Sequence, residues 1–195
     1  MLFLAVGSLG FVCMLLFDWA DSRRWKLKGI LWLAAAGCIV SSCVVLAVGS
    51  SRLSVPVPLR ILGAISAAVF LVLLVFSLFL EIPLARSYRK SSGIRHVIRT
   101  GTYALVRHPG VLWFFFLTLS LVPVTGSLAL CAAVPLWTGL NVLLVLLEDR
   151  VFFPKVFGRE YKAYTRRVPF LIPTPSSLQA FFSTFLKRGK VWTLH

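Results

Sequence analysis

The side chains best suited to chemistry gather in two short polar segments of an otherwise apolar chain. Residues 95–110 hold two of the three histidines and end in Arg107-His108-Pro109-Gly110, directly before a long apolar run. Residues 148–173 begin with Glu148-Asp149 and hold three of the six acids. Polar groups beside hydrocarbon are costly unless they are used. We therefore expect the two segments to close over one another at a membrane surface and form one site.

The corner at His108-Pro109 is suited to binding a carboxylate. Proline is tolerated in the first turn of a helix, where backbone amides and the helix dipole favour an anion. Arg107 adds a planar fork of donors for the same group. The alternative is that Arg107 and His108 are interfacial residues that contact lipid phosphate.

The acid pair Glu148-Asp149 is predicted to end an apolar span. Two acids at a helix C-terminus oppose the helix dipole, so we expect a cationic partner there. That partner is either a ligand or a basic residue of the first segment: Arg95, Arg99 or Arg107.

Tyr161 and Tyr164 lie three residues apart and share one helical face, where they could wall a cation pocket. Alternatively, they seat the helix on the membrane. Carboxylate binders, acids and aromatics together suit a cationic cofactor with a free amino acid end, such as S-adenosylmethionine. Methyl transfer from a sulfonium needs in-line geometry and a dry site more than acid–base groups.

The elements that must position these residues are membrane helices. The chain of 195 residues is 58% hydrophobic and only 14% charged, with a mean hydropathy of +0.89, whereas soluble domains are about a quarter charged. The net charge of +15 sits at the ends of apolar runs, which indicates contact with membrane lipids rather than nucleic acid. The cysteines also fall in apolar runs, so we expect buried free thiols and no metal site. They are Cys13, Cys38, Cys43 and Cys131.

We predict an all-α integral membrane protein with about five transmembrane helices. The apolar runs are residues 2–17, 29–49, 60–80, 111–122 and 127–147. Asp18–Lys28 is predicted as a charged loop, although the short first run is expected to borrow Asp18-Trp19-Ala20 in order to span the bilayer. Ser50–Leu59 is predicted as a turn because Pro56 and Pro58 disfavour helix, and Pro123–Gly126 as a second turn. This gives an N-terminal three-span region (1–80), a core (81–173) and a tail (174–195).

Short amphipathic helices are predicted after the last span. One follows the break at Gly158, and three prolines then keep residues 168–175 extended. Ser176 or Ser177 is predicted to cap a final helix through Leu186 that lies in the membrane interface. Its apolar stripe is Leu178, Phe181, Phe182 and Phe185, followed by Lys187, Arg188 and Lys190.

The basic residues predict the orientation. The first loop, residues 81–110 and the C-terminal tail hold 4, 6 and 9 of the 21 basic residues. By the positive-inside rule these parts are cytoplasmic and the N-terminus faces out. Short loops and compact size favour a prokaryotic inner membrane.

The chain resembles the membrane-integral methyltransferases that include isoprenylcysteine carboxyl methyltransferases and phospholipid N-methyltransferases. The resemblance covers roughly residues 86–173 and rests on the order and spacing of five elements. These are Gly101-Thr-Tyr103, Arg107-His108-Pro109, Glu148-Asp149, Phe157-Gly158-Arg-Glu160-Tyr161-Lys-Ala-Tyr164 and Val168-Pro169.

The resemblance implies a site for S-adenosylmethionine and a lipophilic or lipid acceptor. In the cofactor pocket it places Arg95, His96, Val97, Ile98 and Tyr103. It implies contacts to the methionine end of the cofactor from His108, Pro109, Gly110 and Val111. Glu148 or Asp149 would contact the amino group or ribose, and Arg107 would orient the site. Together with the cation-pocket tyrosines Tyr161 and Tyr164, these are the predicted site residues, with Arg107, Glu148 and Asp149 the candidates for catalysis.

The chain also departs from the family pattern. Val111 stands where the family usually has Tyr, and the acid pair is Glu-Asp. Leu144 or Val145 replaces the arginine that is implicated in binding the substrate carboxylate, which argues against an isoprenylcysteine acceptor. Two alternatives stay open: an NADPH-dependent reductase of the steroid-reductase-like type, and a non-catalytic membrane protein that retains the fold.

Overall fold

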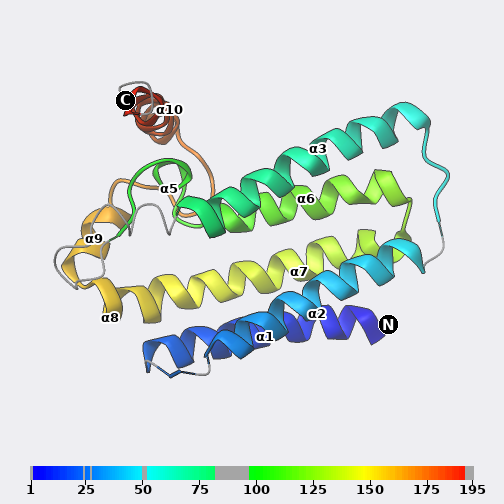
Figure 1. Cartoon of the computed structure of the whole chain (residues 1–195), viewed down its shortest axis with the longest axis horizontal. Coiled ribbons are helices and arrows are strands. Elements are labelled where there is room, and N and C mark those ends of the chain that lie inside the picture. The colour runs from blue at the N-terminus through cyan, green and yellow to red at the C-terminus, as the bar shows by residue number, and fades with distance from the viewer. Residues whose placement is uncertain (1, 24, 27, 50–51, 82–96, 192–195) are drawn as a thin grey trace. The chain divides into compact units, whose positions relative to one another are not determined.

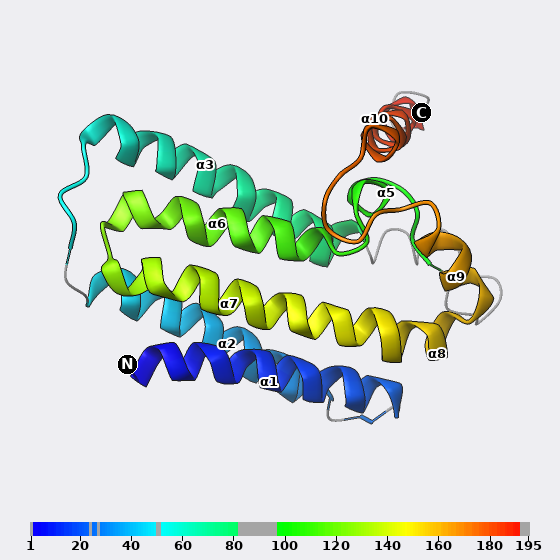
Figure 2. The same ribbon diagram turned by 180° about the vertical axis from the view of Figure 1, so that it is seen from behind.

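A computed structural model describes residues 2–23, 25–26, 28–49, 52–81 and 97–191, and it is built of helices (Figures 1 and 2). The chain forms two compact units. Unit 1 consists of Met1–Leu71 and Phe114–Phe152, and unit 2 consists of Val72–Trp113 and Phe153–His195. Each unit combines two segments that are far apart in sequence, and each boundary between the units falls inside a continuous helix.

The long helices confirm the all-α membrane class. They are α1 (Leu2–Ser22), α2 (Lys28–Val48), α3 (Val57–Val75) continued by the π-helical η1 (Phe76–Glu81), and α7 (Leu128–Leu147) continued by η2 (Glu148–Phe152) and α8 (Phe153–Phe157). In the described part, these four are long and apolar enough to cross a membrane. The predicted fourth span is α6 (Pro109–Thr125), a shorter apolar helix of 17 residues. Satisfying every backbone group internally makes such helices stable in hydrocarbon.

Unit 1 is held together by α1, α2 and α7, with α6 packed against the same core. Trp137 of α7 is fully buried among Phe11, Leu46 and Leu130. Its ring lies so close to Gly7 of α1 that a Cβ there would sit 2.2 Å from Cζ2 of the indole. Small residues let membrane helices approach in this way. The α1–α7 contact therefore depends on the large indole of Trp137 and on the absence of a side chain at Gly7.

A second fixed point of unit 1 is the turn between α6 and α7. Gly126 has a φ of 70° and its carbonyl accepts a hydrogen bond from the Leu53 amide at 2.7 Å. The buried Ser127 caps α7 by accepting from the Leu130 amide at 3.0 Å, and its hydroxyl donates to the Leu46 carbonyl at 2.6 Å. The turn thereby ties α7 to the end of α2.

Among its described residues, unit 2 has three short helices and one long one in addition to η1 and its shares of α3 and α6. They are α5 (Thr102–Leu105), α9 (Arg159–Thr165), α8 and α10 (Pro175–Val191). As predicted, Gly158 separates two helices, with a φ of 54°, and no helix forms between Arg166 and Thr174.

Four predicted boundaries are wrong, each for an identifiable reason. The first helix includes Asp18-Trp19-Ala20, as expected for a short span, but it continues to Ser22 within the predicted loop, since nothing in that stretch breaks a helix. The third starts at Val57, because Pro58 falls in its first turn, where proline is tolerated. α6 continues through Pro123 and ends at Thr125, directly before the positive-φ Gly126.

The fourth wrong boundary affects the acid pair. The backbone stays helical from Leu128 to Phe157, so Glu148 and Asp149 lie inside a continuous helix and not at its end. An unfavourable dipole at a terminus therefore gives no reason to expect a cation there.

The final helix also begins differently. It starts at Pro175 with Thr174 before it, and Thr174 and Ser177 exchange hydrogen bonds from each backbone amide to the other's hydroxyl, at 2.9 and 3.3 Å. Ser177 thus completes a reciprocal box, whereas we predicted that Ser176 or Ser177 would be the cap.

The four cysteines are free, as predicted, but none is fully buried. Cys13, Cys38 and Cys43 are partly exposed and Cys131 is exposed. Apolar composition alone does not tell a core-facing thiol from one on the lipid-facing side of a span.

Candidate functional site

The candidate site in unit 2 is built around the turn that starts α5. Gly101 has a φ of 60° and a ψ of −134°, a conformation that essentially only glycine adopts. Its amide donates to the hydroxyl of Thr184 of α10 at 3.1 Å. The next amide, that of Thr102, points at the carboxyl group of Glu81. The turn is therefore held from two sides.

Glu81 is fully buried and receives the Thr102 amide on both carboxyl oxygens, at 3.2 and 3.1 Å. The hydroxyl of Thr102 donates to the same group. A Cβ on Gly101 would lie 1.8 Å from Oε1 of Glu81. A buried polar group needs such partners to repay its lost hydration. Glu81 thus anchors the segment that carries Tyr103 and Arg107.

Sequence reasoning did not select Glu81 or Thr102. The available signal was that Glu81 is the one acid between Asp21 and Glu148, placed at the very end of an apolar run. An acid kept there needs a partner, and a Gly-Thr turn downstream supplies amides.

The segment 97–110 packs against the segment 153–170. Tyr164 donates its phenol hydrogen to the Tyr103 carbonyl at 2.7 Å, and the Arg107 amide donates to the Pro169 carbonyl at 2.9 Å. The side chain of Tyr103 reaches the Ser77 carbonyl at 3.4 Å. Two predicted site segments, whose connecting residues Tyr103 and Tyr164 are 61 positions apart in sequence, are therefore joined within unit 2.

His108 is packed between aromatic rings. It is 6% exposed, stacks on Phe153 with the ring centres 5.8 Å apart, and meets the edge of Phe170 at 5.3 Å. The guanidinium of Arg107 lies 5.3 Å from the centre of the Phe170 ring, a geometry of mutual attraction. Neither phenylalanine was selected from the sequence, because aromatic residues in apolar surroundings carry no signal of their own.

The first turn of α6 offers fewer amides than predicted. Pro109 has none, and the Val111 amide donates to the His108 carbonyl at 3.2 Å. Gly110 is the close-approach residue of this corner, since a Cβ there would meet the Leu78 side chain at 3.3 Å. A carboxylate at this corner would rely on Arg107 and the Gly110 amide.

The tyrosines of α9 belong to a small core. Tyr161 and Tyr164 are 3% and 4% exposed and pack with Val97, Phe153 and Phe157. On the predicted shared face, their ring centres lie 6.0 Å apart. This core, rather than an open surface, is what the pair forms in the structure.

Glu160 connects the start of the described segment to α9. Its carboxyl accepts from the Val97 amide at 3.3 Å and pairs with Arg99 at 3.4 Å. Arg99 therefore has an acid partner within unit 2. Ile98 is half-buried beside it, while Arg95 and His96 lie outside the described residues.

The acid pair belongs to unit 1. There the carboxyl groups of Glu148 of η2 and Asp18 of α1 lie close enough to interact. Asp18 was predicted in a loop, so this partner was missed. The predicted meeting of Glu148-Asp149 with the Arg107-His108 corner stays a prediction.

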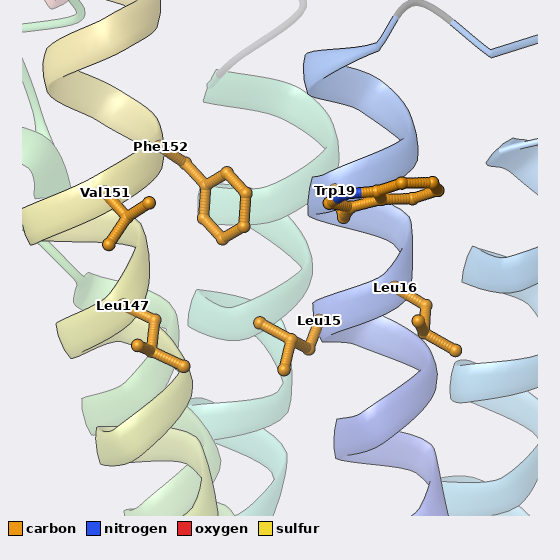
Figure 3. A pocket seen from close by; sticks show the side chains of 6 residues that line it. All are labelled: Leu15, Leu16, Trp19, Leu147, Val151 and Phe152. Atoms are coloured by element: carbon orange, nitrogen blue, oxygen red, sulfur yellow. The ribbon is translucent and has the colours of Figure 1, made fainter.

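Near Asp18 and Glu148, unit 1 has an apolar pocket of about 410 Å³ (Figure 3). α1 contributes Leu15, Leu16 and Trp19, and α7 with η2 contributes Leu147, Val151 and Phe152. Leu15 and Asp18 are three residues apart and Glu148 and Phe152 four apart, so each acid neighbours a pocket residue on its own helix. The lining suits hydrocarbon and not a polar ligand.

No protein-family model, curated protein or solved structure matches the chain.

Proposed function

We propose that the chain is a methyltransferase that moves a methyl group from S-adenosylmethionine to a lipophilic acceptor at the cytoplasmic face of a membrane. The observation that carries this proposal is the pairing of segments 97–110 and 153–170 in unit 2. Hydrogen bonds from Arg107 to Pro169 and from Tyr164 to Tyr103 connect the segments that carry four of the five elements on which the resemblance rests, all except Glu148-Asp149.

The residues of this corner fit the methionine end of the cofactor. Arg107 supplies a fork of donors for a carboxylate, and the aromatic rings around His108 exclude water. When bound, the cofactor supplies an electrophilic methyl group, whose bond to sulfur breaks as its bond to the acceptor forms. A dry, rigid corner assists by fixing the line of approach.

The long apolar helices support a lipophilic acceptor, because such a molecule would enter from the bilayer. Positive residues on one set of loops support the cytoplasmic placement, and the prokaryotic inner membrane is part of the same proposal. Glu148 or Asp149 is proposed to contact the amino group or ribose of the cofactor.

Calorimetry on the full chain in detergent tests the proposal. S-adenosylmethionine and S-adenosylhomocysteine are expected to bind saturably. His108→Phe keeps a flat ring between Phe153 and Phe170 but removes the ring nitrogens, and Arg107→Gln removes the charge. If these groups contact the cofactor, each variant should weaken binding about tenfold, since a lost hydrogen bond to a charged group is worth about 1.5 kcal/mol or more.

Ser183→Ala is the matched control in unit 2, because that hydroxyl is exposed and donates only to Ala180 within its own helix. Its affinity should equal that of the unaltered chain. Saturable binding of NADPH without any adenosyl ligand would replace the proposal by the reductase. If none of the three ligands binds while the helical fold is retained, the result would favour a non-catalytic protein.

A further inference from the structure

Helix α10 has three distinct faces. Ser177 and Thr184, with Ala180 between them, form its packed face: Ser177 is 2% exposed and Thr184 bonds to Gly101. Leu178 and Phe182 point outward, 41% and 58% exposed. Helical periodicity puts these two side by side. The neighbouring positions Gln179 and Ser183 form an exposed polar face.

The structure therefore divides the stripe seen in the sequence. Phe181 is half-buried, whereas Leu178 and Phe182 have no cover in the described part of the chain. Exposing large apolar side chains to water is unfavourable by about 25 cal/mol per Å². α10 packs within unit 2 through small polar residues and presents leucine and phenylalanine outward. We therefore expect this outward strip to contact a further partner.

The direction of α10 within unit 2 identifies that contact. In Figures 1 and 2, α10 is seen nearly end-on, whereas η1, the continuation of the ribbon labelled α3, runs in the plane of the picture. α10 thus runs crosswise to η1 (Figure 1), which together with Val72–Val75 is the part of the apolar helix Val57–Glu81 that belongs to the same unit. A helix crosswise to a span lies along the membrane surface, where an apolar strip can enter the headgroup boundary.

The charge at the end of α10 indicates which kind of membrane surface it would bind. The last turns of α10 include Lys187, Arg188 and Lys190 in the sequence, and no acid follows Glu160. Basic residues next to a membrane-embedded apolar strip favour anionic headgroups by roughly fivefold in the bound population for each charge.

We propose that α10 docks on an anionic lipid surface through Leu178 and Phe182, while its opposite face holds the Gly101 turn through Thr184. This inference goes beyond the proposed methyl transfer and holds whether or not the chain is an enzyme. The lipid is bound as a surface, and no lipid molecule is changed.

Site-specific quenching on the full chain tests the docking. After the four native cysteines are replaced, single cysteines are placed at Phe182 or, as matched control, at the adjacent Ser183, and labelled with bimane. The protein is reconstituted in vesicles of phosphatidylcholine with or without phosphatidylglycerol. With phosphatidylglycerol, the label at 182 should be quenched by lipids with a nitroxide near the headgroup, and the label at 183 by aqueous iodide.

A second pair, Leu178→Cys and Gln179→Cys, keeps the test valid if one substitution perturbs folding. Lys187→Gln, Arg188→Gln and Lys190→Gln together should reduce the preference for phosphatidylglycerol by roughly fivefold per charge, and salt should do the same. Equal iodide quenching at 182 and 183 would overturn the proposal. Disulfide-linked dimers through position 182, increasing with protein density, would assign this face to a second copy of the chain instead.

Discussion

At the scale of single residues, two glycines of unit 2 have almost the same backbone conformation but differ in what an added side chain would contact. Gly101 has φ 60° and ψ −134°, and Gly158 has φ 54° and ψ −126°. A Cβ at Gly158 meets nothing within 4 Å, but at Gly101 it collides with the carboxyl of Glu81. Substituting each glycine in turn therefore distinguishes the cost of backbone strain from the cost of losing the hydrogen bonds of Glu81.

We expect Gly158→Ala to lower the free energy of unfolding by about 1–3 kcal/mol, the cost of a forbidden conformation. Gly101→Ala should lose about 1–3 kcal/mol more, because the hydrogen bonds of a buried acid are also broken. Denaturation in a mixed-micelle titration measures both. If the two variants prove equally stable, Glu81 does not depend on the space at Gly101.

At the scale of helices, the contact of α1 with α7 is set by Gly7 and Trp137. Gly7→Ala places a methyl group inside the indole ring, so the helices must move apart, and we expect a loss of about 1–3 kcal/mol in the free energy of unfolding. Trp137→Phe should recover part of that loss in the double variant, a coupling that a mutant cycle reports.

Gly37 provides the matched control. It lies in α2 of the same unit with open space around its Cα. Gly37→Ala should be neutral or stabilise by up to about 1 kcal/mol, since alanine is the better helix former. A loss at Gly37 as large as that at Gly7 would show that the effect is not steric.

The existence of each long helix was predictable, and several of its ends were not. Apolar runs located α2 and α7 within a residue or two, and Ser127 was a recognisable start. The ends were missed where polar residues stayed helical, and among these Asp18 and Glu148 are tertiary partners of one another. Local sequence does not contain that partner.

At the scale of the whole molecule, the site was predictable only in part. The motif residues in 97–110 and 153–170 do pack together, because Tyr103, Arg107 and Tyr164 make the connecting hydrogen bonds. The residues that hold this arrangement, Glu81 and Thr184, come from elements outside those motifs. Which distant side chain completes a turn depends on the three-dimensional path of the chain, and spacing does not reveal it.

The topology gives the last prediction. Between Ser54 and Ser176 lie α3, α6 and the helix from Leu128 to Phe157, so the two serines face opposite sides if each helix crosses the bilayer. The positive-inside rule puts Ser176 in the cytoplasm. Both serines are exposed, so single cysteines at these positions, in an otherwise cysteine-free chain, are accessible to an impermeant maleimide. In sealed vesicles of known orientation, Ser176→Cys should react from the cytoplasmic side and Ser54→Cys from the other.

Ser91, which lies outside the described residues, should label with Ser176. α6 is the critical element, because its 17 residues rise only about 26 Å, which falls short of the hydrocarbon thickness of about 30 Å. Labelling of Ser54 and Ser176 from one side would mean an even number of crossings, and α6 would then lie within the membrane without spanning it. Labelling of Ser54 and Ser91 from one side would instead contradict α3 as a span and overturn the orientation derived from the basic residues.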